Sequence, residues 1–218
     1  MELYHILNRG VDKRVVFTDT QDYVRFYRNL LTLNDIENVP HNQWSIDARL
    51  NKKRGSVKKL VEIHSYCLMP NHYHMLISPI ADDGIALFMK KINMGYSKYF
   101  NERNERTGAL WQGKYKSIPI LRDSHFNYIP YYIHLNPLDL KFPGWRKGKI
   151  DNPSSAFKFL EAYRWSSHQF FLNTHEQNNP VVQDSFLIKS IPQQALYLQE
   201  IGLIISDPLL AKQSELIE

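Results

Sequence analysis

The sequence predicts an α+β fold, a ferredoxin-like sandwich with one central antiparallel sheet. Two observations lead to this prediction. Short apolar runs alternate with longer segments whose apolar residues recur every three or four positions, in the order strand, helix, two strands, helix, strand, helix. The two middle strands should form a hairpin, because the turn-forming pair Pro70 and Asn71 separates them.

Each element of this order follows from a local pattern. Strands are expected at residues 3–8, at the apolar runs 61–69 and 72–78, and at residues 114–120. Helices are expected where aromatic and aliphatic residues keep helical spacing, at residues 20–33, 83–103 and 123–135. Residues 17–20 offer N-cap side chains for the first helix. Pro130 should kink or delay the third helix, because proline removes a backbone hydrogen bond.

Residues 1–150 are predicted to form one domain, and residues 151–218 a small helical extension packed on it. An inserted surface loop is expected at residues 35–60, which are polar and irregular. Residues 142–149 are interpreted as a linker. Cys67 is interpreted as a core residue, because no second cysteine exists to pair with it. The helices of the extension are expected at residues 154–163 and 192–203.

Composition narrows the class of partner. The chain has 27 Lys and Arg against 22 Asp and Glu, a net charge of +5 that suits a polyanion. Its hydrophobic content of 43% is enough for a core. The start lacks a signal pattern, and no run of about 18 apolar residues occurs. We therefore expect a soluble, cytoplasmic protein without a membrane partner, either a monomer or a homodimer.

His72 and His74 form the first candidate site. Alternate residues of a strand face the same side with Cα atoms about 7 Å apart, so both imidazoles could bind one metal ion. Taken alone, such a pair is more often two partly buried strand residues.

Tyr132 and Asn136 form the second candidate site. Residues four apart share one face of a helix, which places the tyrosine hydroxyl beside the asparagine amide. The amide oxygen suits Mg²⁺ or Mn²⁺, and a tyrosine can form a covalent bond to phosphate. The ordinary alternative is a structural tyrosine near an asparagine cap.

Five separate segments resemble one known family. They are Tyr4 to Gly10, Met69 to His74, Gly113 to Ser117, Tyr132 to Pro137 and Tyr163 to Ser167. The chain resembles the single-tyrosine HUH transposases of the insertion-sequence 200/605 type over residues 3–170, and most closely the REP-associated tyrosine transposases.

The resemblance implies a chemistry for both candidate sites. His72, His74 and Asn136 would bind Mg²⁺ or Mn²⁺, and Tyr132 would be the nucleophile. Tyr131, the adjacent competitor, points about 100° away around the helix. The implied activity is that of a metal-dependent DNA endonuclease and strand transferase, which cleaves single-stranded or hairpin-flanked DNA through a covalent 5′-phosphotyrosine.

Several other side chains are candidates for nucleic-acid contact, either as phosphate-binding cations or as stacking aromatics. They are Arg9, Lys13, Arg14, Arg103, Arg106, Lys114 and Lys116, with Trp111 and Tyr115 as stacking surfaces. His5 lies in a matching segment and could touch nucleic acid or the site. The remaining histidines read as strand, surface or packing residues, namely His41, His64, His125, His134, His168 and His175.

Two other functions remain open from the sequence. A ferredoxin-like sheet can bind single-stranded nucleic acid by aromatic stacking without catalysis, as a domesticated transposase would. A phosphoesterase that uses water as nucleophile would also need His72 and His74 but not Tyr132.

Overall fold

The computed structural model describes residues 2–37, 58–172, 179–182, 186–187 and 194–207. The chain divides into two compact units. Unit 1 comprises residues 1–63 and 68–120, and unit 2 comprises residues 64–67 and 121–218. The division near residue 120 differs from the predicted boundary at 150. Most of the predicted inserted loop, residues 38–57, lies outside the described residues.

Unit 1 is built around a four-stranded sheet with the order β2-β3-β1-β4. The strands are β1 (Tyr4–Arg9), β2 (Val61–Met69), β3 (His72–Pro79) and β4 (Lys116–Pro119). β1 is antiparallel to both β3 and β4. With α1 (Thr20–Thr32) between β1 and β2, and α3 (Gly84–Arg103) between β3 and β4, this is the predicted ferredoxin-like order. A short 3-10 helix, η1 (Val11–Lys13), follows β1.

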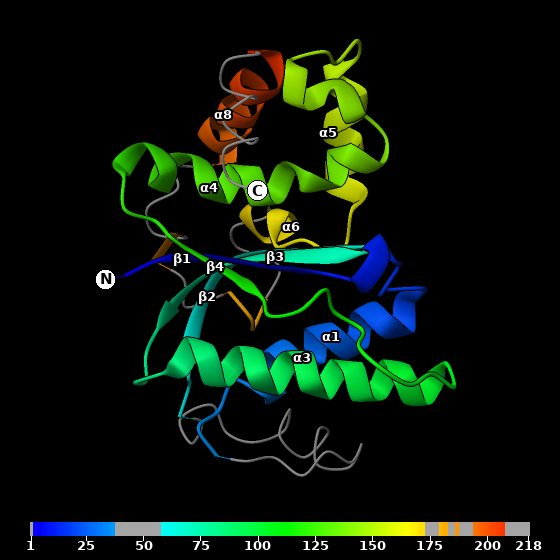
Figure 1. Cartoon of the computed structure of the whole chain (residues 1–218). Coiled ribbons are helices and arrows are strands. Elements are labelled where there is room, and N and C mark those ends of the chain that lie inside the picture. The colour runs from blue at the N-terminus through cyan, green and yellow to red at the C-terminus, as the bar shows by residue number, and fades with distance from the viewer. Residues whose placement is uncertain (1, 38–57, 173–178, 183–185, 188–193, 208–218) are drawn as a thin grey trace. The chain divides into compact units, whose positions relative to one another are not determined.

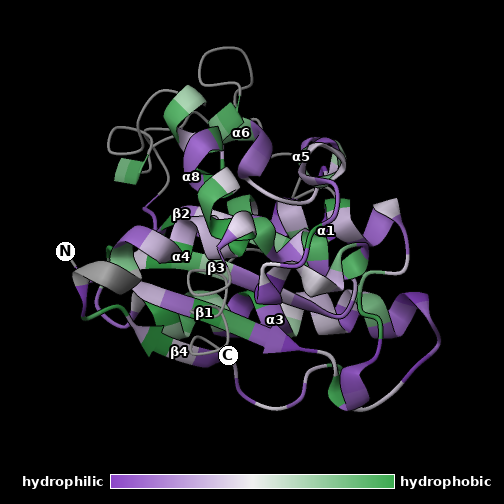
Figure 2. Cartoon of the chain, turned by 90° about the horizontal axis from the view of Figure 1, so that it is seen from above, coloured by the Kyte–Doolittle hydropathy of each residue, from purple (hydrophilic) through white to green (hydrophobic). Residues whose placement is uncertain are grey.

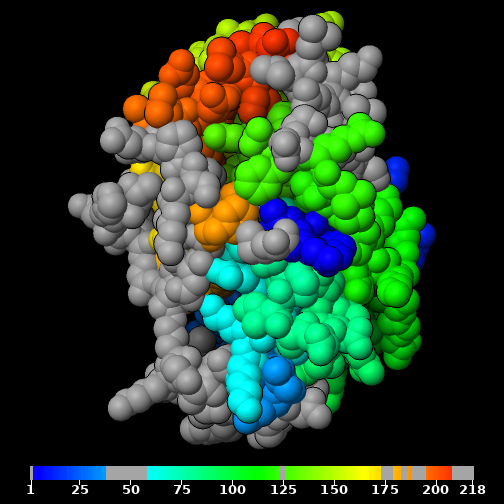
Figure 3. Space-filling view, turned by 90° about the vertical axis from the view of Figure 1, so that its left-hand side faces the viewer, coloured from blue at the N-terminus to red at the C-terminus, as the bar shows by residue number. Residues whose placement is uncertain are grey.

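The register between β1 and β3 fixes which side chains share a face of the sheet. Leu7 lies opposite His74, and Arg9 lies opposite His72. In the space-filling view the blue start of the chain lies against the teal residues at the end of β3, in agreement with the pairing of Tyr4 and Ile77 (Figure 3). The middle of β1 is apolar and its ends are polar, as Figure 2 shows.

Helices α1 and α3 cover one face of this sheet (Figure 1). The core beneath them is aromatic. Phe26 of α1 packs on Tyr73 of β3 at 5.1 Å between ring centroids, and on Tyr96 of α3 at 5.1 Å. The ring of Trp111 completes the cluster, 5.3 Å from the ring of Tyr73. Since successive strand residues point to opposite faces, His72 and His74 lie on the face away from α1 and α3.

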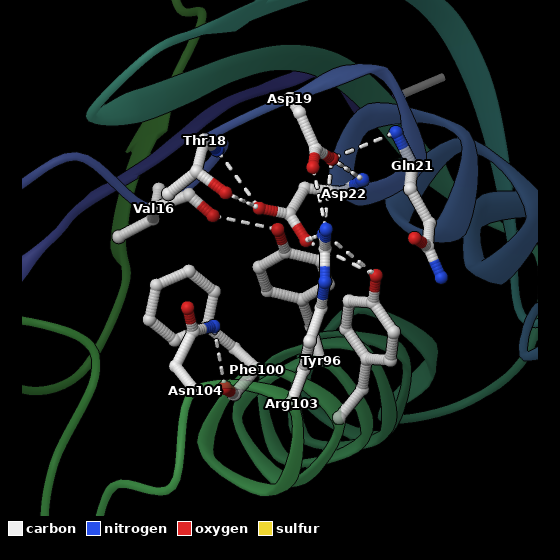
Figure 4. A network of polar contacts seen from close by, with 10 residues as sticks. Val16, Thr18, Asp19, Gln21, Asp22, Tyr96, Phe100, Arg103 and Asn104 are labelled. Carbon is white, nitrogen blue, oxygen red and sulfur yellow. Dashed lines mark hydrogen bonds and ion pairs between the residues drawn. The ribbon is translucent and has the colours of Figure 1, made fainter.

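A polar network joins α1 to the end of α3 (Figure 4). Asp19 is the N-cap of α1 and accepts hydrogen bonds from the backbone of Gln21 and Asp22. Asp22 is fully buried, and its carboxylate accepts from the Thr18 backbone, the Thr18 hydroxyl, the Tyr99 hydroxyl and Arg103. The Arg103 guanidinium also donates to Asp19, which lowers the pKa of that carboxyl to about 2.

The Asp22→Ala substitution is expected to destabilise unit 1 by about 3–5 kcal/mol, because it leaves the Thr18 backbone amide, two hydroxyls and one hydrogen bond of the Arg103 guanidinium without their buried acceptor. The measurement is the free energy of unfolding in urea. Glu102→Ala is the matched control, since Glu102 pairs with Lys98 at 3.7 Å but is exposed; its cost should stay within about 0.5 kcal/mol. Equal costs for the two substitutions would contradict this account.

Unit 2 is mainly helical. Its elements are α4 (Asp123–Leu135), η3 (Asn136–Leu140), η4 (Pro143–Lys147), α5 (Pro153–Ala162), α6 (His168–Leu172) and α8 (Gln194–Ser206). α4 begins at Asp123 and continues through Pro130, so the proline does not delay the helix. The predicted linker at residues 142–149 is wrong. It holds η4, whose Trp145 is fully buried and donates from its ring nitrogen to Asp139 at 2.6 Å.

A buried polar network joins three helices of unit 2. The Tyr197 hydroxyl lies 2.7 Å from Nδ1 of His134 and 2.7 Å from Nδ1 of His168. Nε2 of His134 lies 2.7 Å from the Ser167 hydroxyl. Burial lowers the pKa of both imidazoles, that of His168 to about 3. These two histidines therefore serve as neutral packing residues. None of the helices in the described residues is long and apolar enough to cross a membrane.

Candidate active site

The paired histidines lie on one face of β3, as their spacing predicts. The ring centroids of His72 and His74 are 4.9 Å apart, and the rings are nearly perpendicular. Tyr73 between them points into the aromatic core. His72 is 8% exposed and His74 is 1% exposed. The two imidazoles are thus close enough to share one ligand, and His72 is the more accessible.

Both imidazoles are held through the same ring nitrogen. Nδ1 of His72 lies 2.5 Å from the side-chain oxygen of Asn71, which can only accept, so this Nδ1 carries the proton. Asn71 in turn donates its amide nitrogen to the Lys13 carbonyl at 3.2 Å, which fixes the orientation of the amide. Nδ1 of His74 lies 2.9 Å from Nε2 of His5. Metal-ligating histidines commonly have one nitrogen anchored in this way.

This donor chemistry is compatible with a divalent cation. Each imidazole can turn its Nε2 toward a metal while Nδ1 is anchored. Within the described part of the chain, no group of three His, Cys, Asp or Glu side chains could hold a metal ion. The third ligand expected from the sequence, the amide oxygen of Asn136, is of another type and belongs to unit 2.

His5 is the site neighbour that sequence reasoning left unassigned. It is fully buried on β1, and its ring stacks on that of His74 at 5.1 Å between centroids and 15° between planes. Burial lowers the pKa of His5 to about 3, so the ring is neutral at physiological pH. The sequence showed only that His5 lies on the first strand. The register between β1 and β3 places it beside His74.

Tyr132 and Asn136 lie at the end of α4 in unit 2. The Asn136 amide nitrogen donates to the Tyr132 carbonyl at 2.8 Å, as residues four apart in a helix can. Its amide oxygen accepts from Arg146 at 3.2 Å. Both side chains are fully buried. The Tyr132 ring has no exposure to solvent, because an aromatic and a cationic neighbour pack against it.

Arg146 is the second site neighbour that the sequence did not indicate. Its guanidinium lies over the Tyr132 ring, 5.3 Å from the centroid. Asp139 holds it with two hydrogen bonds, one to Nε at 3.0 Å and one to Nη2 at 2.7 Å. Arg146 was overlooked because it lies in the Pro- and Gly-containing segment interpreted as linker. The geometry fixes both the Asn136 amide and one face of the Tyr132 ring.

Tyr131 points to a different side of α4, as predicted. Its ring stacks on Tyr197 at 5.4 Å between centroids. Burial, and to a lesser degree Glu200, raise the pKa of Tyr131 to about 12. Its environment is therefore distinct from that of Tyr132.

Comparison with known families finds a match over part of the chain. The model of the IS200-like transposases matches residues 37–136, a range that includes both histidines of β3 as well as Tyr132 and Asn136. The resemblance to the insertion-sequence 200 type is confirmed over these residues. A solved structure of a REP-associated tyrosine transposase bound to a REP hairpin is similar with a TM-score of 0.46 and 13% identity, over 81% of this chain and 82% of that chain. The comparison with curated proteins found no match.

Three of the predicted nucleic-acid contacts have partners within the chain. Trp111 is only 7% exposed and packs in the core, with its ring nitrogen on the Asn93 carbonyl, so little of its ring is accessible for stacking. Arg103 is bound to Asp19 and Asp22. Arg106 donates to Asn101 at 2.6 Å. The sequence alone could not show that these three side chains have partners within the chain. Those partners lie in other segments, or are brought close by the conformation of a loop.

The other predicted nucleic-acid contacts are at least partly exposed to solvent, so nucleic acid could reach them. Lys13, Lys114 and Lys116 are exposed, and Tyr115 is half-buried beneath the Lys114 ammonium at 5.9 Å from its ring centroid. Lys116 lies opposite Leu7, and Leu7 lies opposite His74, so Lys116 shares the face of the histidines. Arg9, opposite His72, shares it too. Arg14 donates to the Val11 carbonyl at 3.2 Å and is partly exposed.

Proposed function

We propose that this protein is a DNA strand-cleaving and rejoining enzyme of the REP-associated branch of the IS200-like transposases. The observation that carries the proposal is the anchored pair His72 and His74 within the segment matched by the family model. Its substrate would be single-stranded or hairpin DNA, as the resemblance to these transposases implies.

His72 and His74 would hold a divalent cation, Mg²⁺ or Mn²⁺, with Asn136 as the third protein ligand. Such an ion neutralises phosphate charge and orients the phosphodiester. The chain's own contribution is to present two neutral imidazoles from one rigid strand. Asn71 and His5 hold these rings, so little freedom is lost when a ligand binds.

Tyr132 would supply the nucleophile. Its hydroxyl would lose its proton, and its oxygen would form a bond to phosphorus while the bond from phosphorus to the 3′ oxygen breaks. The departing 3′ oxygen would take up a proton, so no net proton is consumed. The DNA would then be held through a 5′-phosphotyrosine, and the reverse reaction would join a strand without an external energy source. This step requires the buried Tyr132 hydroxyl to become accessible, so the side chains packed around Tyr132, among them Arg146, would have to move when DNA binds.

One observation favours a different enzyme. Tyr132 is fully buried, whereas His72 keeps some exposure. A phosphoesterase with water as nucleophile would need the paired histidines but no access to Tyr132. Such an enzyme would cleave DNA without a covalent intermediate. The experiment that decides is a denaturing gel of the protein with labelled repeat DNA from the flanks of its own gene, in the presence of Mn²⁺.

Binding of single-stranded DNA is expected to weaken with salt, with a logarithmic slope of about −0.7 per phosphate neutralised. Replacing Lys114 and Lys116 together with alanine should reduce the slope by about 1.4 if each contacts one phosphate. The measurement is fluorescence anisotropy of a labelled hairpin with a single-stranded flank at several salt concentrations.

The matched control for that variant replaces Lys90 and Lys98, two exposed lysines of α3 on the opposite side of the sheet. It removes the same charge, so the slope should remain that of the unsubstituted protein. If the salt slope falls equally in both double variants, DNA binding depends on the net charge of the protein and not on the face that carries Lys114 and Lys116.

A further inference from the structure

We propose that His5 is a positioning residue that holds His74 in the one tautomer able to bind a metal ion. The inference rests on the proposed metal-binding role of His74. His5 itself would touch neither metal nor DNA, because its contribution passes through the neighbouring ring.

The contact between the two rings is set by the sheet. β1 and β3 pair so that His5 lies opposite Leu76 and His74 lies opposite Leu7, which makes the histidines diagonal neighbours on one face. Nε2 of His5 is 2.9 Å from Nδ1 of His74, the distance of a direct hydrogen bond. Both rings are almost fully buried, at 0% and 1% exposure. Water therefore does not stand between them.

One proton must lie between these two nitrogens, and its location decides what His74 can do. If Nε2 of His5 donates, Nδ1 of His74 accepts and the His74 proton sits on Nε2, where it blocks a metal. If Nδ1 of His74 donates, its Nε2 keeps a lone pair that can bind a metal. The second arrangement requires Nε2 of His5 to be an acceptor. Only this arrangement is compatible with the proposed site.

The neighbouring His72 supports the second arrangement. Its Nδ1 faces the Asn71 oxygen, so it donates, and its Nε2 keeps the lone pair. With His5 as acceptor, both imidazoles of the pair would be anchored through a protonated Nδ1 and would offer Nε2. The alternative role for His5 is packing, which a leucine of similar size could also perform.

The test compares two substitutions at this position. In His5→Leu the volume is kept and the acceptor is lost, so Mn²⁺ affinity should fall by about 10–100-fold. In His5→Gln the amide oxygen can accept near the former Nε2, so most of the affinity should return. Affinity is measured from the free Mn²⁺ signal in electron paramagnetic resonance, with circular dichroism to establish that each variant is folded.

His64→Leu is the matched control, because His64 is also a fully buried strand histidine and its ring packs on Phe186 at 4.6 Å between centroids. It should leave Mn²⁺ affinity unchanged. If folded His5→Leu binds Mn²⁺ as tightly as the unsubstituted protein, His5 is a packing residue and the inference is wrong.

A second readout needs no metal. Nitrogen-15 NMR of the imidazoles in the unsubstituted protein should show the His74 proton on Nδ1, and a proton on Nε2 would overturn the inference. If the unsubstituted protein binds no Mn²⁺ at all, the proposed metal role fails, and this tautomer measurement still decides whether His5 orients His74.

Discussion

Replacing Tyr132 with phenylalanine is expected to abolish the covalent protein–DNA adduct. The substitution removes the one oxygen that would bond to phosphorus. The fold should survive, because loss of one buried hydroxyl costs about 1 kcal/mol. The measurement is a denaturing gel with labelled DNA and Mn²⁺, in which the adduct band should fall to background.

Tyr131→Phe is the matched control for that experiment. Tyr131 carries the same group on the adjacent position, but its ring stacks on Tyr197 and not beside Asn136. This variant should retain most of the adduct. An adduct that persists in Tyr132→Phe would refute the assignment. Cleavage without adduct in the unsubstituted protein and in both variants would establish the water-dependent phosphoesterase.

Alanine at His74 is expected to reduce metal-dependent cleavage by at least about 100-fold, and alanine at His72 to do the same. Each substitution removes one of two imidazoles that would hold the cation, a larger loss than that of an outer-shell partner. DNA binding should remain, because phosphate contacts by surface cations supply most of the affinity. Cleavage rates with Mn²⁺ and anisotropy with the same labelled hairpin measure the two effects separately.

His168→Ala provides the control for these substitutions. It removes a buried imidazole that belongs to the network of unit 2 and has no proposed metal role. Cleavage by this variant should fall only in proportion to the fraction of protein that is unfolded, which circular dichroism measures. If His72→Ala and His74→Ala cleave at the rate of the unsubstituted protein, the metal site lies elsewhere.

The local elements of the fold could be predicted because each is determined by a periodic pattern. The aromatic residues of α1 and α3 recur at helical spacing, and Pro70 with Asn71 terminates one strand and starts the next. The same-face arrangement of His72 and His74 followed from the two-residue period of a strand. These features depend on residues close in sequence, so they are visible without the fold.

The environment of the site could not be predicted in the same way, because it depends on contacts between distant segments. His5 meets His74 across 69 positions of sequence, and only the register of β1 and β3 brings them together. Trp111 resembled a stacking surface because its sequence neighbourhood is basic and turn-rich, although its ring packs against Tyr73. Arg146 was missed for another reason: proline and glycine in its segment indicate a loop but do not reveal a 3-10 helix with a buried tryptophan.

The buried imidazoles of unit 2 couple its unfolding to proton uptake. Burial lowers the pKa of His64 to about 4 and that of His168 to about 3, and His134 is shifted in the same direction. Below about pH 6.5 the unfolded chain binds protons on these rings while the folded chain does not. The stability present above pH 6.5 is therefore lost as the pH falls, by about 1.4 kcal/mol per pH unit for each ring. Unfolding of this unit is therefore expected to become easier between about pH 6.5 and pH 4, where these rings remain neutral only in the folded chain.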